Sequence, residues 1–259
     1  MNKLTTLTLA ALLLAPMAAL HAAEPTTTQQ IDQKTLDEWS APYRGWHYYA
    51  DPVIPSDWKI PANEKFHSYD VPTVYQLPGH DGKWYMGFIG FNGQGYNSFV
   101  CESTNLINWT NPRLAMGFGK EGEFDFGGCV VGAYLYESYP NNPVVPVRKG
   151  GYDEKFCADG KVFRDGDHWV MFYFGVGKGG AHIMAAFSRD LVNWTAHPEP
   201  LYKAGGHPGG LDKQFAHKMS LVYNKANETF YMYYCACGNK GRCVGLITSK
   251  PLKASDVSK

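Results

Sequence analysis

Short stretches of alternating hydrophobic and polar residues run along most of the chain, separated by Gly, Asn, Asp and Pro. The hydrophobic positions are rich in aromatic and β-branched side chains, as in residues 83–90 and 168–175. This pattern is typical of strands joined by turns. Residues 24–40 are polar and compatible with one short helix, and no convincing amphipathic helical pattern follows them. The pattern therefore predicts an all-β fold.

The strand-like stretches recur at a fixed spacing. Trp84 and Ser103 are 19 positions apart, and so are Trp169 and Ser188. In both copies a second tryptophan follows the first by 25 positions, and a third, partial copy covers residues 229–252. One such unit leaves its faces uncovered, whereas several units stacked radially bury them. The repeat therefore predicts a β-propeller.

Blade length sets the expected size of this propeller. Blades of about 40–50 residues allow about five in the part of the chain that follows residue 23. Residues 43–58 and 124–137 would supply the less regular strands of the remaining blades. The prediction is a five-bladed β-propeller, and the alternative is a β-sandwich in which the similarity of the repeats is accidental.

Composition and charge narrow the class of partner. The chain has 24 basic and 24 acidic residues and a formal net charge of zero. It therefore lacks the broad positive field that binding to nucleic acid or to an anionic membrane usually needs. Because 44% of the residues are hydrophobic, the chain can bury a substantial core, which argues against wholesale disorder.

The first 23 residues have the layout of a secretory signal peptide. Lys3 gives a positive start, residues 7–20 are apolar, and the small residues Ala22 and Ala23 precede Glu24. We expect a signal peptide over residues 1–23, a leader over 24–40 and one propeller domain over 41–259. The protein would be secreted or periplasmic and free of the membrane after cleavage. An uncleaved membrane anchor is the alternative.

Export changes the interpretation of the six cysteines, because disulfides persist in oxidising compartments. The cysteines are spread through strand-like stretches, and no C-x-x-C spacing of the zinc type occurs. Cys235 and Cys237 would point the same way on a strand. We expect buried free thiols and no metal site, with one disulfide among Cys235, Cys237 and Cys243 left open.

Several motifs resemble those of the five-bladed propeller glycosidases, the superfamily that contains glycoside hydrolase families 43, 32, 62 and 117. The likeness covers about residues 42–253. It rests on the blade-closing pattern S-x-D-L-x-x-W and on four further stretches. The motifs occupy residues 188–194, with a degenerate copy at 103–109, and residues 70–75, 122–128, 158–163 and 216–223.

The resemblance implies an axial funnel into which acidic side chains point from different blades. In family 43-like enzymes one Asp activates water, a Glu or Asp protonates the leaving oxygen, and another Asp orients that acid. In family 32-like enzymes the first Asp attacks the sugar instead. No cofactor is required, although the resemblance allows a calcium ion in the axial channel.

Glycoside cleavage needs one ionised and one protonated carboxyl on either side of the bond. Asp70 opens the first clear repeat and is the candidate base or nucleophile. Asp159 resembles the Asp that begins such a strand in the family, with Gly160 where proline is frequent, and would orient the substrate or tune the acid. Asp125 and Glu123 would share one face of a strand, because side chains alternate along it. No motif decides between Glu123, Glu137 and Glu154 as the general acid.

Four further residues are candidates for substrate binding. His217 and Lys218 open the last repeat and could bind a sugar hydroxyl or carboxylate. Trp46 and His47 could form a wall against a sugar ring, and packing in the core is the alternative for these residues.

The sequence therefore favours an exported glycosidase that acts on a terminal sugar of a plant or algal carbohydrate. A propeller that binds glycans without cleaving them is the main alternative. A glycoside phosphorylase is a further alternative, with Lys218, His217 and Arg148 as the only suggestive phosphate ligands. The oligomeric state is not predicted.

Overall fold

The computed structural model describes residues 30–60, 66–117, 119–122 and 145–258. Strands dominate this part of the chain, and none of its helices is long and apolar enough to cross a membrane. Residues 1–23, in which the signal peptide is expected, and residues 124–137, in which further strands are expected, lie outside the described residues.

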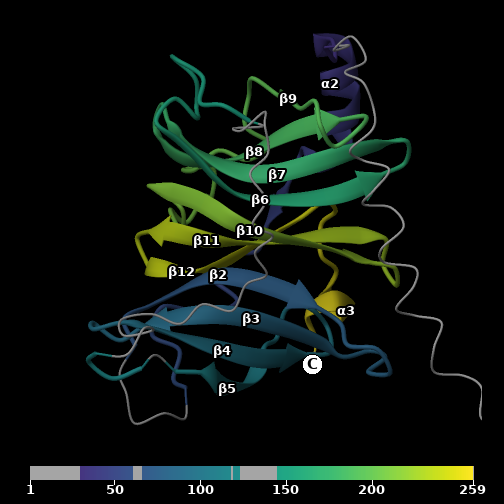
Figure 1. Cartoon of the computed structure of the whole chain (residues 1–259). Coiled ribbons are helices and arrows are strands. Elements are labelled where there is room, and N and C mark those ends of the chain that lie inside the picture. Colours follow the sequence, from purple (N-terminus) through teal and green to yellow (C-terminus); the bar gives the residue numbers. More distant parts are fainter. Residues whose placement is uncertain (1–29, 61–65, 118, 123–144, 259) are drawn as a thin grey trace, which may run out of the picture. The chain divides into compact units, whose positions relative to one another are not determined.

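The described strands form a four-stranded antiparallel sheet and an eight-stranded sheet, whose two antiparallel halves meet at a single parallel pair, Phe215 with Ala181 (Figure 1). The smaller sheet and the two halves of the larger one give three four-stranded units, each built around one copy of the sequence repeat. The first unit consists of β2 (Ser68–Tyr75), β3 (Trp84–Phe91), β4 (Tyr96–Ser103) and β5 (Thr110–Met116). The second consists of β6 (Phe156–Asp165), β7 (His168–Gly177), β8 (Gly180–Ser188) and β9 (Thr195–Ala196). The third consists of β10 (Phe215–Asn224), β11 (Thr229–Gly238), β12 (Gly241–Thr248) and β1 (His47–Tyr48). We call them blades one, two and three.

The blade-closing motif owes its repetition to local hydrogen bonds. Ser188 Oγ accepts hydrogen bonds from the backbone amides of Asp190 at 3.2 Å and Leu191 at 2.9 Å. Ser103, at the equivalent place in blade one, makes the same two bonds at the same distances. Leu191 and Leu106 both have a left-handed backbone, with φ of 66° and 65°. The same short sequence therefore folds into the same turn twice.

Blade three is completed by a strand from much earlier in the chain. His47 of β1 pairs with Thr248 of β12, and the nearby Ile54 bridges to Val244 of the same strand. Residues 43–58 therefore add to blade three among the described residues, where we had expected strands for a separate blade.

The leader expected over residues 24–40 belongs to the folded unit from Ile31 onward. Helix α2 (Gln33–Ser40) begins at an N-cap, Asp32, whose side chain accepts a hydrogen bond from the amide of Thr35 at 2.7 Å. Ile31 and Leu36 are buried in the same hydrophobic cluster as the strands of blades two and three. A 3₁₀ turn (Ala41–Tyr43) follows α2, and the short helix α3 (Ala254–Val257) comes after the last strand.

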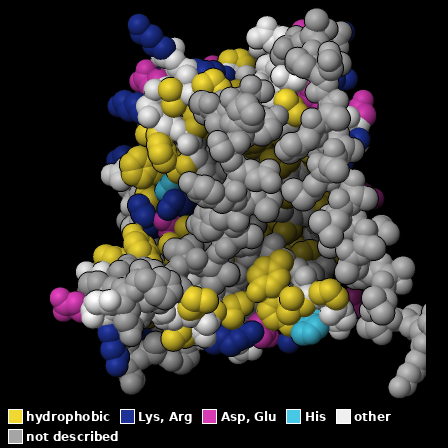
Figure 2. Space-filling model, viewed as in Figure 1, with side chains coloured by type: hydrophobic (Ala, Val, Ile, Leu, Met, Phe, Trp, Pro, Cys, Tyr) yellow, Lys and Arg dark blue, Asp and Glu magenta, His cyan; other side chains and the backbone are white. Residues whose placement is uncertain are grey.

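Two hydrophobic clusters account for most of the core. One lies among blades two and three and includes Phe172, Phe187 and Tyr234. The other joins blade one to the opposite face of blade three and includes Phe88, Phe99 and Tyr233. The surface carries hydrophobic side chains among charged ones, as the face shown in Figure 2 illustrates. The clusters fix β2 beside β10, β11 and β12, and these strands carry the candidate site.

Candidate functional site

The first strand of each blade is interrupted at the same place by an irregularity in pairing. It falls between residues 70 and 73 in β2, 158 and 161 in β6, and 217 and 220 in β10. Inside it lies a non-glycine residue with a left-handed backbone: Val71 (φ 53°), Asp159 (φ 57°) and Lys218 (φ 51°). This conformation costs roughly 1–2 kcal/mol for such residues. Strain of this kind tends to collect at functional sites.

Asp70 directly precedes the strained residue of β2 and is 1% exposed. Its Oδ2 atom accepts hydrogen bonds from Lys218 Nζ at 2.6 Å and from Arg242 Nη1 at 2.9 Å. Its Oδ1 atom accepts a hydrogen bond from the amide of Val71 at 2.7 Å. The carboxylate of blade one is therefore held by two cationic side chains of blade three.

These contacts determine the charge of Asp70. Burial alone would raise its pKa, because a carboxylate is poorly solvated in the interior. The charge of Lys218 and the hydrogen bonds from Cys235 and Lys218 outweigh burial and lower the pKa of Asp70 below its usual value. Asp70 is therefore ionised at neutral pH.

His217 lies next to this ion pair and is neutral. It is 7% exposed, and burial lowers its pKa, against the opposing effect of Asp70. Its Nδ1 atom lies 3.1 Å from the backbone carbonyl oxygen of Cys235. Because a carbonyl only accepts, Nδ1 carries the proton and Nε2 keeps its lone pair.

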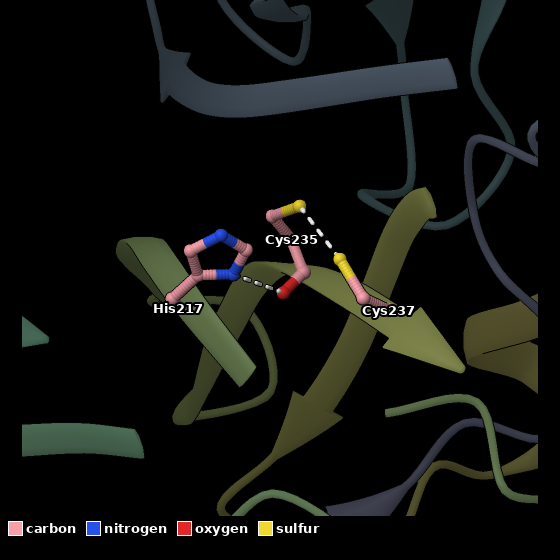
Figure 3. A group of neighbouring side chains, drawn as sticks. All are labelled: His217, Cys235 and Cys237. Carbon is pink, nitrogen blue, oxygen red and sulfur yellow. Dashed lines mark hydrogen bonds between the residues drawn. The ribbon is translucent and has the colours of Figure 1, made fainter. Parts of the chain in front are cut away.

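Two thiols of β11 complete the group (Figure 3). Cys235 and Cys237 lie two positions apart on the strand, with Sγ atoms 4.0 Å apart. Burial raises the pKa of Cys235. The hydrogen bond with Cys235 lowers the pKa of Cys237, and Arg242 adds to this effect. The described cysteines are free, so none of the disulfides left open among residues 235, 237 and 243 is formed.

The structure thus brings together three residues that the sequence singled out: Asp70, His217 and Lys218. Sequence reasoning missed Arg242, which follows the tight turn between β11 and β12. It also treated Cys235 and Cys237 as packing residues. Two features could have marked these cysteines as part of the group. Their i, i+2 spacing places both side chains on one face of β11, and His217 pairs directly with Cys235 across the two strands.

Asp159 lies one position after the residue that is equivalent to Asp70. It is the strained residue of β6 and so matches Val71 and Lys218, whereas Ala158 occupies the position equivalent to Asp70. Asp159 Oδ2 pairs with Lys161 Nζ of the same strand at 2.5 Å, and the side chain is 30% exposed.

The remaining candidate site residues differ in their exposure to solvent and in whether the structure describes them. Trp46 is 8% exposed and packs in the core cluster of blades two and three, which is the packing role considered as the alternative. His47 is exposed on β1. Glu123 and Asp125 lie outside the described residues, so their roles stay predictions.

Two further buried carboxylates have a structural role. Asp153 is fully buried and binds Arg148, with 2.8 Å between Oδ2 and Nη2, and the hydroxyl of Tyr173 at 2.8 Å. Asp212, before the first strand of blade three, is also fully buried and accepts a hydrogen bond from Tyr234 at 3.1 Å. Each carboxylate fixes the segment that leads into the first strand of its blade.

The calcium ion that the resemblance allowed stays a prediction, and the group of possible metal ligands near Asp70 is of another kind. Among the described residues, the group of three or more side chains close enough to share a metal is His217, Cys235 and Cys237. Calcium takes oxygen ligands, whereas this group offers one nitrogen and two sulfur atoms.

Comparison with known proteins identifies the fold. No family model matches the chain, and no curated protein sequence matches it either. A solved structure described as a glycoside hydrolase aligns with a TM-score of 0.67 over 86% of this chain and 97% of its own length, at 18% identity. A solved complex of BT0996 and RGII aligns with a TM-score of 0.66 over the same shares, also at 18% identity. The chain therefore shares the β-propeller fold of these structures. The all-β propeller predicted from the repeat, and the resemblance at the level of fold, are confirmed.

Proposed function

We propose that the protein is an exported glycoside hydrolase that removes a terminal sugar from a plant or algal oligosaccharide or polysaccharide. The observation that supports this best is the ionised Asp70, buried next to a strained residue in the first strand of a blade. The fold shared with a glycoside hydrolase structure supports the same class of reaction.

Asp70 would act as the ionised member of the carboxyl pair. Its lowered pKa suits a base or nucleophile and does not suit an acid, because a general acid must hold its proton near neutral pH. Lys218 and Arg242 would keep the carboxylate charged and fix its direction. The protonated partner would be Glu123, Glu137 or Glu154, with Asp125 and Asp159 assisting.

The decisive experiment combines a substrate screen with one isosteric variant. The purified protein is tested on aryl glycosides and on plant and marine oligosaccharides. Asp70→Asn keeps the shape of the side chain and should lower kcat by at least about 10³-fold, as expected for the loss of a charged catalytic group. Asp81→Asn, at an exposed turn residue, is the matched control and should keep full activity. Full turnover by a folded Asp70→Asn protein would remove Asp70 from the mechanism.

One observation favours glycan binding without cleavage as the second candidate. Both oxygens of Asp70 already accept hydrogen bonds, and its side chain is 2% exposed. A saturated carboxylate of this kind can instead hold Lys218 and Arg242 in place, and these side chains are 26% and 34% exposed. Calorimetric binding of an oligosaccharide, with no product released from any member of the panel, would support this candidate over the hydrolase.

A further inference from the structure

The buried group of His217, Cys235 and Cys237 has the chemistry of a soft metal site. One ring nitrogen of His217 and the two Sγ atoms all lie within 4.8 Å of one another. Each of the three residues is less than a tenth exposed. Thiolate and imidazole are the ligands that zinc prefers, and three such ligands with an open fourth position are typical of reactive zinc sites.

The spacing of the sulfur atoms fits a shared metal better than a disulfide. Cys235 Sγ and Cys237 Sγ are 4.0 Å apart, about twice the length of an S–S bond. Two thiolates bound to zinc at about 2.3 Å in tetrahedral geometry lie about 3.8 Å apart. Alternation along β11 points both side chains to the same face of the strand, so the strand itself sets this distance.

The imidazole of His217 has one ring nitrogen free to bind a metal. Its Nδ1–H donates to the Cys235 carbonyl at 3.1 Å, which leaves the Nε2 lone pair available (Figure 3). Metal-binding histidines usually donate their second ring nitrogen to a carbonyl or carboxylate in this way. The carbonyl belongs to one of the two cysteines, so the same residue supplies a ligand and orients another.

The surroundings can also accommodate the charge. The Cys235 thiol hydrogen-bonds to Asp70, and the guanidinium of Arg242 hydrogen-bonds to Cys237. Hydrogen bonds of this kind to ligand atoms orient them and tune the metal. Two thiolates and Asp70 carry three negative charges, which would balance Lys218, Arg242 and half of the charge of a divalent ion.

We propose that His217, Cys235 and Cys237 bind one zinc ion, with the fourth position open to water or to an atom of a ligand. Binding forms two Zn–S bonds and one Zn–N bond and releases the two thiol protons to solvent. The site is independent of the proposed hydrolase activity, because it rests on the donor atoms and their spacing alone.

The test uses the full chain, reduced and stripped of metal, with Co²⁺ as a spectroscopic substitute for zinc. We expect one Co²⁺ per chain, with the intense visible bands of a tetrahedral site and a thiolate-to-cobalt charge-transfer band. Zinc should abolish both. Cys235→Ser and Cys237→Ser should each lose the charge-transfer intensity or the binding. Cys243→Ser is the matched control, because Cys243 is equally buried on β12 but lies outside the group.

A second measurement keeps the proposal testable if the cysteine variants do not fold. Zinc at about 100 times its Kd should raise the Tm of the unmodified chain by about 5–10 °C over a chelator-treated sample. Wild-type protein that binds neither Co²⁺ nor zinc under reducing conditions would overturn the proposal. Retention of the full cobalt spectrum in both Cys235→Ser and Cys237→Ser would also overturn it, as would binding of copper(I) alone.

Discussion

The ion pair at Asp70 leads to a quantitative prediction about stability. In the variant Lys218→Met/Arg242→Met, the buried carboxylate loses both cations and keeps only the amide of Val71 and the thiol of Cys235 as partners. Methionine is close in length to both side chains and adds no new charge. The variant therefore isolates the effect of leaving one buried carboxylate uncompensated.

The size of the effect has an upper limit, because the carboxyl can take up a proton when ionisation becomes too unfavourable. Protonating a group with a reference pKa of about 3.9 at pH 7 costs about 4 kcal/mol. The triple variant that adds Asp70→Asn removes the charge and escapes this penalty. We therefore expect the triple variant to be more stable at pH 7 than the double variant by up to about 4 kcal/mol, or about 8–16 °C in Tm.

The pH dependence follows from the direction of the pKa shift. In the wild type the folded pKa of Asp70 lies below its unfolded value, so its contribution is present above the unfolded pKa and is lost as pH falls through the folded pKa. In the double variant the folded pKa should instead lie above the unfolded value. Its deficit relative to the triple variant should then shrink as the pH falls from 7 toward about 4.

The assay is urea unfolding followed by tryptophan fluorescence, in the presence of a chelator, at several pH values. Equal unfolding midpoints for the double and triple variants at pH 7 would refute the reasoning. That result would mean that the carboxylate reaches water or another partner once the two cations are gone.

Two further predictions concern glycine packing and a neutral histidine. A methyl group on Gly177 would lie 2.5 Å from the backbone oxygen of Gly151, so Gly177→Ala should lower the free energy of unfolding in urea by about 1–3 kcal/mol. Gly87→Ala is the control, because the nearest atom to its methyl group would be 3.9 Å away, and its stability in urea should change little. His182 Nδ1 accepts the amide of Ala204 at 3.0 Å and Nε2 donates to the Lys178 carbonyl at 2.9 Å, and burial lowers its pKa. The unfolded state then binds more protons, so the stability that His182 contributes is complete above its unfolded pKa of about 6.5 and is lost as pH falls below it. A His182→Gln protein should show a flatter urea-stability profile between pH 7 and 5, and an unchanged profile would contradict this account.

The blades could be predicted from the sequence because the interactions that define them are local. The turn around Ser188 needs hydrogen bonds only to residues two and three positions later, so the same letters produce the same structure in blade one. Strand and turn residues also fall in a regular order. The repeat therefore specified the strands and turns within its own copies without knowledge of any distant contact, but it did not specify that β1 completes blade three.

The candidate site was less predictable because it depends on contacts between strands. Arg242 reaches Asp70 across 172 positions of sequence, and no local pattern marks it. The irregularity in each first strand is a further feature that no local pattern marks, and it makes Asp159 equivalent to Val71 and not to Asp70. The sequence did reveal Asp70 and His217, because a titratable residue at the start of a hydrophobic strand is unusual.

The pairing of β1 with β12 has a consequence for how the protein is made. His47 and Tyr48 are synthesised early, whereas their partners Thr248 and Ile247 emerge about 200 positions later. Contacts so distant in sequence slow folding, because the long intervening loop must close before the pairing stabilises anything. During translation, β1 therefore has no partner strand until Ile247 and Thr248 have left the ribosome, and the third blade is completed only then.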